Sequence, residues 1–234
     1  MRHYFTLDSK CSADFNCYIA RSNMFDGAEH DDTTVEVPGR NGALVFSNGR
    51  YRNFAGLLSC YIPDNMRKNV DGLRAFLSAR HDYVRYEDTL HPAEFRKVRF
   101  TGAFAIEESD RNGATFNLSF SCFPERWLKS GEVIFDYTAA GKIYNPTDYA
   151  AKPLILCYGT GGTVVINGVT VAVTGCSSYA EIDCDAMEVY EGSTNRNGTT
   201  TLVNGEFPTI APGENIITFT GFSKVSIKPR WYTI

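Results

Sequence analysis

Apolar and polar residues alternate along most of this chain, which is typical of strands with one buried face. In the first half, every second residue is apolar in the runs 54–62 and 116–122, and a shorter run of this kind lies at 83–87. Residues 98–106 also alternate, and a turn at 109–113 joins them to the run 116–122. These two runs therefore predict a hairpin with one apolar and one polar side.

One segment has helical periodicity instead. Asp64 is suited to cap its first turn, because a carboxylate there accepts hydrogen bonds from free N–H groups. We predict a helix at about 64–79 that covers the apolar side of the hairpin, since Gly72 at its centre makes it dependent on packing. Its apolar face consists of residues spaced by four, three and four: Met66, Val70, Leu73 and Leu77.

The second half consists of short β-branched runs separated by turns, a spacing that favours a β-sandwich. Asn167-Gly168 supplies the positive φ angles of a type I′ turn between two such runs. The polar stretch 193–201 is interpreted as an exposed hairpin loop. Strands are predicted at 154–158, 163–166, 169–171, 179–183, 187–191, 215–220 and 224–228.

The pattern loosens between these halves, where prolines and turn residues are frequent. We therefore predict a β domain with one helix at 1–130, a connection at 131–149 and a sandwich at 150–234. The fold class is mainly β, in agreement with 13% aromatic residues, which pack well on a pleated surface.

Charge and cysteine content restrict the function. A net charge of -4 argues against non-specific DNA binding, and no apolar run is long enough for a membrane helix. The first residues lack the apolar region of a signal peptide, so export through the N-terminus is not expected. The seven cysteines contain no C-x-x-C pair. Cys60 and Cys122 are therefore interpreted as small buried side chains of a protein in a reducing compartment.

Three alternating carboxylates, Glu181, Asp183 and Asp185, are the strongest candidates for chemistry. They suit a glycosidase pair or a hard cation, but a solvated strand face ending in a turn is the favoured interpretation. The glycines at 159–162 lack a phosphate-loop spacing and precede a strand, so a hairpin loop is expected there. His3, His30, His81 and His91 show no metal-ligand spacing. We expect no catalytic residues, no metal, no cofactor and no enzyme activity.

Two further groups suggest binding. Arg96, Lys97 and Arg99 beside aromatic residues suit a nucleic-acid surface, although a solvated strand face opposite the core is favoured. Trp127 and Trp231 suit sugar stacking, with packing roles favoured. A lectin-like saccharide-binding module for attachment to a host surface therefore remains the alternative function, and a glycosidase is a weaker third.

Taken in order, the segments resemble a known family. VPGRNG, FAGLLSCYI, LRAFL, YVRYEDTLHP and FNLSFSCFP are followed by ING, EIDCDAMEVY, GEFPTIAPGENIITFTG and SIKPRW. This order resembles the distal tail proteins of long-tailed bacteriophages and prophages, over nearly the whole chain. The sequence lacks the inserted carbohydrate-binding modules of some larger members.

The resemblance implies a virion structural protein at the tail tip or baseplate, assembled in the cytoplasm of the bacterial host. Members form a homohexameric ring from the N-terminal domain, while a galectin-like sandwich projects outward. The ring joins the tail tube protein to the tail-tip or tail-associated lysin protein, and DNA passes through it. Receptor-binding or accessory proteins dock on the second domain where they exist. An acidic chain suits such a conduit, because a basic channel would retain phosphate.

Within this picture, the break in the extended run at 35–46 has a structural meaning. Its turns would let a strand arm reach the ring interface, with the arginine available to a carboxylate of the next subunit. A plain intramolecular hairpin is the alternative. The predicted interface residues are Pro38, Gly39, Arg40, Asn41 and Gly42.

Overall fold

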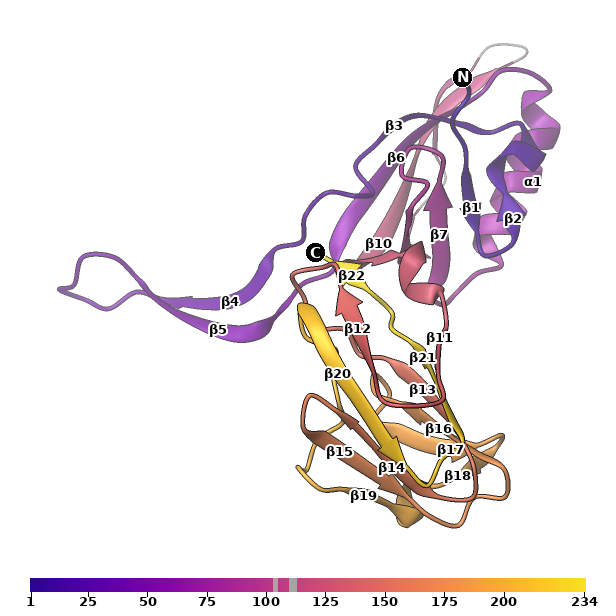
Figure 1. Ribbon diagram of the computed structural model, residues 1–234. Coiled ribbons are helices and arrows are strands. Elements are labelled where there is room, and N and C mark those ends of the chain that lie inside the picture. Colours follow the sequence, from indigo (N-terminus) through magenta and orange to yellow (C-terminus); the bar gives the residue numbers. More distant parts are fainter. Residues whose placement is uncertain (103–104, 110–112) are drawn as a thin grey trace. The chain divides into compact units, whose positions relative to one another are not determined.

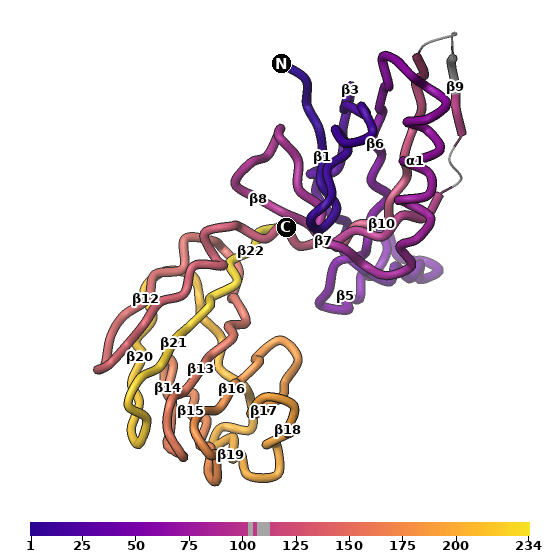
Figure 2. Tube along the Cα trace, turned by 90° about the vertical axis from the view of Figure 1, so that its right-hand side faces the viewer, coloured from indigo at the N-terminus to yellow at the C-terminus, as the bar shows by residue number. Residues whose placement is uncertain are grey.

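The computed structural model describes residues 1–102, 105–109 and 113–234, which form two compact units (Figures 1 and 2). Unit 1 comprises residues 1–126 together with Ile234, and unit 2 comprises 127–233. Within the described residues, the only α-helix is α1 (Met66–Ser78), and strands dominate the rest. The predicted mainly β fold class is therefore confirmed. None of the described helical segments is long and apolar enough to span a bilayer.

Unit 1 is built on an antiparallel sheet in the order β2-β1-β7-β8-β10-β6-β3, with β9 also paired to β10. Its longest ladder joins β10 to β6, from Ala114 opposite Ile62 to Cys122 opposite Phe54. The strands are β1 (Phe5–Leu7), β2 (Lys10–Cys11), β3 (Tyr18–Ser22), β6 (Phe54–Ile62), β7 (Val84–Asp88), β8 (Glu94–Phe100), β9 (Ala105–Ser109) and β10 (Ala114–Leu128), and a 3-10 turn, η1, spans Ser12–Phe15.

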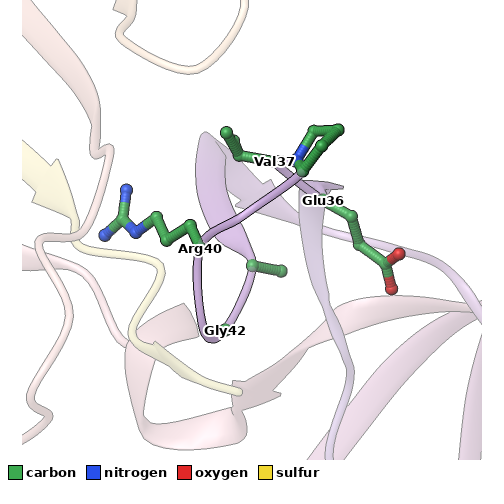
Figure 3. A pocket seen from close by; sticks show the side chains of 6 residues that line it. Glu36, Val37, Arg40 and Gly42 are labelled. Atoms are coloured by element: carbon green, nitrogen blue, oxygen red, sulfur yellow. The ribbon is translucent and has the colours of Figure 1, made fainter.

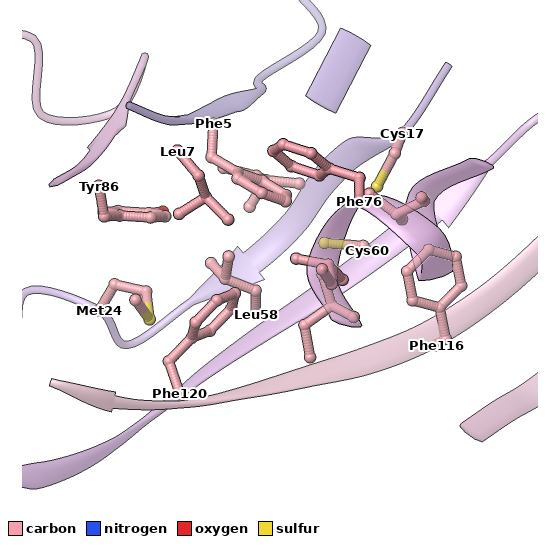
Figure 4. Packing of buried hydrophobic residues seen from close by; sticks show 14 of the residues in the cluster. Phe5, Leu7, Cys17, Met24, Leu58, Cys60, Phe76, Tyr86, Phe116 and Phe120 are labelled. Atoms are coloured by element: carbon pink, nitrogen blue, oxygen red, sulfur yellow. The ribbon is translucent and has the colours of Figure 1, made fainter. Parts of the chain in front are cut away.

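Helix α1 packs on this sheet as its periodicity predicts. Val70, Leu73 and Leu77 are buried in one core with the inward residues of β6 and β10. Phe76, which the pattern did not mark, is also buried there (Figure 4). Cys60 and Cys122 are buried and free, as predicted. Burial raises the pKa of the Cys122 thiol to about 11, so this thiol remains protonated at neutral pH.

Asp64 does not cap the helix, so this prediction is wrong. The residue before the first turn is Asn65, whose φ of 47° is left-handed and whose side chain makes no capping bond. Asp64 instead accepts a hydrogen bond from the side-chain amide of Asn16, at the end of η1. The carboxylate therefore links two neighbouring segments.

The predicted strand 98–106 is divided in the structure. β8 ends at Phe100 and β9 begins at Ala105. Val98 is buried as expected, whereas Ile106 is 36% exposed. Phe104 and residues 110–112 of the predicted turn lie outside the described residues.

Unit 2 is the predicted β-sandwich. One sheet runs β11-β21-β13-β16-β17-β18 and the other β12-β20-β14-β15-β19, and their inner faces share one apolar core. The turn between β14 and β15 has φ of 50° at Asn167 and 86° at Gly168, as a type I′ turn requires. The strands are β11 (Phe135–Tyr137), β12 (Gly141–Asn145), β13 (Leu154–Tyr158), β14 (Gly162–Ile166), β15 (Val169–Val173), β16 (Tyr179–Asp183), β17 (Glu188–Glu191), β18 (Thr194–Asn195), β19 (Thr200–Leu202), β20 (Gly213–Thr220) and β21 (Lys224–Lys228). A last short strand, β22 (Tyr232–Thr233), belongs to neither of these two sheets.

Two stretches predicted as irregular contain regular structure. Residues 131–149, expected as a connection, hold β11 and β12, and the 3-10 turn η2 (Lys129–Glu132) overlaps their start. Residues 193–201, expected as a hairpin loop, hold β18, η3 (Asn197–Thr199) and the start of β19. These strands are only two to five residues long, which is too short for alternation to distinguish them from turns.

Residues 159–162 do not form a hairpin loop, because β13 and β14 belong to different sheets. The segment crosses from one sheet of the sandwich to the other. A Cβ at Gly162 would lie 2.2 Å from the main-chain oxygen of Thr220, so the glycine permits a close approach of two backbones.

We therefore predict that Gly162→Ala destabilises the protein by about 1–3 kcal/mol, since the added methyl meets backbone that cannot move aside. The matched control is Gly198→Ala, where no atom lies within 4 Å of the added Cβ. Urea denaturation of both variants measures the difference. Equal midpoints would show that the crossover can relax at no cost.

Candidate functional site

The site that the sequence singled out lies on a hairpin of its own, which we call the arm (residues 30–51). Among the described residues, strands β4 (His30–Val35) and β5 (Leu44–Tyr51) pair only with each other, in a separate two-stranded sheet. Figure 1 shows the arm extending from the sheet of unit 1. In the chain order, it is inserted between β3 and β6.

The five predicted interface residues come together at the tip of the arm. Two glycines there have φ of 80° and 79°, a region that other residues rarely adopt. The N–H of Arg40 donates to the carbonyl of Val37 at 3.1 Å and closes the first turn. The break in the alternating pattern is therefore a hairpin tip, and all its residues are exposed: Pro38, Gly39, Arg40, Asn41 and Gly42.

The tip encloses a shallow hollow. Figure 3 shows the side chains of Glu36 and Arg40 pointing in opposite directions from it. Within the described part of the chain, no carboxylate pairs with the Arg40 guanidinium. This cation is therefore available to a partner. The hollow is lined by Glu36, Val37, Pro38, Arg40, Gly42 and Ala43.

The arm also carries apolar side chains that no core covers. Val45 is 62% exposed and Phe46 is 58% exposed, although they are adjacent on β5 and so point to opposite faces. Val35 and Val37 add to this surface. The sequence analysis did not identify these residues as a surface. The run ALVF nevertheless indicates it, because a strand that is apolar on both faces is normally buried on both faces.

The base of the arm, in contrast, is tightly paired. The Asp31 carboxylate accepts one hydrogen bond from Arg50 Nε and one from Arg52 Nε, each at 2.6 Å. The bond from Arg52 and then that from Arg50 lower the pKa of Asp31 below its ordinary value. The rings of His30 and Tyr51 lie 4.4 Å apart across the same two strands.

The carboxylates of β16 do not form a catalytic pair. Asp183 is 9% exposed and accepts two hydrogen bonds from the Arg230 guanidinium, at 2.7 and 2.9 Å. Burial would raise the pKa of Asp183, but the bonds from Arg230 and from two main-chain N–H groups outweigh it and lower the pKa. Asp185 lies in the following turn and pairs with Lys152 at 3.1 Å. A general acid needs the opposite shift, so this arrangement is structural.

The histidines also have ordinary contacts. His3 lies 3.2 Å from the Thr89 hydroxyl, and His91 lies 3.3 Å from the Asp88 carboxylate. Among the described residues, no group of three or more His, Cys, Asp or Glu side chains is arranged to hold a metal ion.

The expected basic strand face is wrong for Arg96. Its side chain is fully buried on the core face of β8, while Lys97 and Arg99 are exposed on the other face. Trp231 is 3% exposed in the core of unit 2, which confirms its packing role and removes it as a sugar platform. Trp127 is half-buried.

Comparison with solved structures identifies the fold. The crystal structure of SPP1 Dit (gp 19.1), described as a paradigm of the hub adsorption apparatus in phages that infect Gram-positive bacteria, matches with a TM-score of 0.75. The match covers 100% of both chains at 12% sequence identity. The chain has the Dit fold. No family model matches the sequence, and neither does any curated protein. The Dit likeness therefore lies in three-dimensional architecture.

We predict that Asp183→Asn destabilises unit 2 by about 2 kcal/mol, because it leaves the Arg230 charge partly buried without its partner. The lowered pKa of Asp183 stabilises the fold above its ordinary value of 3.8, and this contribution disappears as the pH falls through the lower folded value. The variant should therefore lose less stability than the wild type on acidification below pH 3.8. Thermal melting as a function of pH measures both effects.

The control is Asp185→Asn, since that carboxylate and Lys152 are both more than half exposed and their pair is worth little. If both variants melted alike at neutral pH, the Asp183–Arg230 pair would contribute nothing to stability.

Proposed function

We propose that the chain is a structural subunit of the tail-tip hub of a long-tailed bacteriophage. In this proposal, copies of unit 1 form a homohexameric ring. The ring joins the tail tube protein to the tail-tip or tail-associated lysin protein and lets DNA pass. Unit 2 acts as a galectin-like platform for receptor-binding or accessory proteins, and no cofactor or catalytic step is involved.

The observation that carries the proposal is the exposed arm on a chain with the Dit fold. A two-stranded hairpin is marginally stable alone in water, and this one exposes Val45 and Phe46 on opposite faces. Covering both faces requires a surface outside this copy of the chain. In a closed ring, each copy supplies one arm and receives one, so every arm is covered.

Burial of the arm can account for ring assembly. Removing a Val or Phe side chain from water contributes about 1.5–3 kcal/mol when burial is complete, and each of these residues is more than half exposed in the free chain. Each contact is weak on its own because association costs translational and rotational freedom. Ring closure compensates, since removing one subunit breaks two interfaces.

The rest of the chain fits this structural role. The net charge of -4 suits a channel through which DNA passes without being retained. The Asp183 carboxylate of β16 is occupied by Arg230 and by main-chain donors, which leaves it unsuited to act as the general acid of a glycosidase. Saccharide binding is the competing function, and the burial of Trp231 makes it less favourable. Binding of a monomer to a glycan array would favour that competitor.

The arm can be tested by charge substitution of its apolar residues. We predict that Val45→Asp combined with Phe46→Asp abolishes rings in negative-stain images and gives monomers in light scattering. The free energy of unfolding of the variant monomer should lie within about 0.5 kcal/mol of the wild-type value, because both side chains are exposed in the monomer.

The matched control is Val203→Asp in unit 2, since Val203 is 65% exposed and lies outside the arm. Its rings should be normal. Rings of normal stability in the double variant would exclude the arm from assembly, and a wild-type chain that forms no ring at any concentration would contradict the proposed function.

The tip arginine provides a separate test. We predict that Arg40→Glu lowers ring stability, because a carboxylate would then face the carboxylate of the next subunit that Arg40 is proposed to bind. Arg40→Lys should retain part of the ring stability, and a higher salt concentration should lower the stability of the wild-type ring. The measurement is the concentration at which rings dissociate. Unchanged dissociation of Arg40→Glu would mean that the tip is a simple turn.

A further inference from the structure

Arg96 is fully buried although it carries a charge, and no carboxylate of the described residues is bonded to its guanidinium. Its hydrogen-bond acceptors within the described residues are two main-chain carbonyls, those of Asp26 and Pro124, each at 3.4 Å. Its Nε has no partner there. Burial lowers the pKa of Arg96 to about 10, so the group stays protonated at neutral pH.

Such a charge is costly to bury, and an apolar residue of similar size would often serve stability equally well. Unlike an apolar side chain, the guanidinium makes directional contacts. It donates several N–H bonds in one plane and attracts aromatic faces above and below that plane. The positions of its partners therefore indicate what Arg96 holds in place.

Those partners lie on both ends of the arm. The chain enters the arm through residues 23–29, the incoming leg, and leaves it through residues 52–54, the outgoing leg. On the incoming leg, the guanidinium carbon lies 5.7 Å from the ring centre of Phe25, next to its bond to the Asp26 carbonyl. On the outgoing leg, it lies 4.5 Å from the ring centre of Phe54.

Other contacts fix each leg to the core separately. On the incoming leg, Phe25 stacks on His91 at 4.0 Å. On the outgoing leg, the side-chain amide of Asn53 donates to the Tyr83 hydroxyl at 2.6 Å. Arg96 is distinct because one side chain contacts both legs and, through the Pro124 carbonyl, strand β10. A single side chain thus contacts both legs where they meet the sheet.

We infer that Arg96 is a positioning residue that fixes the direction in which the arm leaves unit 1, so that the arm meets the next copy of the chain. This inference rests on the proposed ring. A rigid arm reaches its neighbour without an ordering cost, whereas a swinging arm must be ordered on binding. Arg96 itself is buried within its own copy, so it acts on the next copy through the arm and not by direct contact.

The direct test measures arm orientation in the monomer. Spin labels on noncanonical amino acids at Asn48, on the arm, and Lys68, on α1, report a distance distribution without involving the seven cysteines. The wild type should give one narrow distribution. Arg96→Met, which keeps the length and removes the charge, should give a broader distribution. Its association constant for each ring contact should fall by about tenfold, because a swinging arm must be ordered on binding.

The matched control is Arg99→Met, on the same strand but on the exposed face, which should leave both readouts unchanged. Arg96→Lys keeps the charge and should restore part of the ordering, and it carries the test if Arg96→Met fails to fold. Phe54→Leu should also broaden the distribution, with no further broadening when it is combined with Arg96→Met.

A distribution of wild-type width in Arg96→Met or, if needed, Arg96→Lys would overturn the inference, whatever happens to the rings. Broadening in a protein that forms no ring would support the positioning of the arm while contradicting the proposed function. The two failures are therefore distinguishable.

Discussion

The antiparallel pairing of β3 with β6 is the constraint on which the arm depends. Ser22 lies opposite Leu58 and Tyr18 opposite Tyr61, so the chain leaves one strand and returns to its direct neighbour. Whatever is inserted between them must leave and re-enter the sheet at closely spaced points. A hairpin meets this condition at the lowest cost, because its own two strands are neighbours as well. The arm is therefore a natural insertion in this sheet, and its base can be closed by a few contacts, such as those of Asp31.

The same constraint separates stability from function. The core of unit 1 is complete without the arm, because α1 and the inward faces of β6 and β10 bury one another. The arm, in contrast, carries apolar side chains that the core of unit 1 does not cover. Exposed apolar surface of this kind is a liability in a monomer and an asset in an assembly. In the proposed ring, the exposed apolar side chains of the arm would be the working surface of the chain.

The parts of the fold that were predictable are those in which a local pattern and a tertiary face coincide. Alternation located the buried faces of β6 and β10, helical spacing located α1, and Asn167-Gly168 located a turn that only positive φ angles allow. The failures have equally physical causes. Asp64 has the chemistry of a cap, but the left-handed Asn65 leaves it no first turn to face. Short strands such as β11 owe their existence to a neighbouring strand, here β21, and sequence periodicity does not report a neighbour.

Arg96 shows why the site was harder to predict than the fold. Sequence analysis assigns an arginine to the solvated face because burying a charge is expensive, and Lys97 and Arg99 follow that rule. Arg96 points inward because alternate residues of a strand share a face, and Val98 is buried on that face. The two-residue period of the strand therefore holds at Arg96, whereas the rule that charged residues face the solvent does not. A conflict of this kind between two local rules marks a position whose contacts must be examined in three dimensions. Those contacts reach residues more than forty positions away along the chain, at Phe54, and seventy away, at Asp26, which no local pattern can encode.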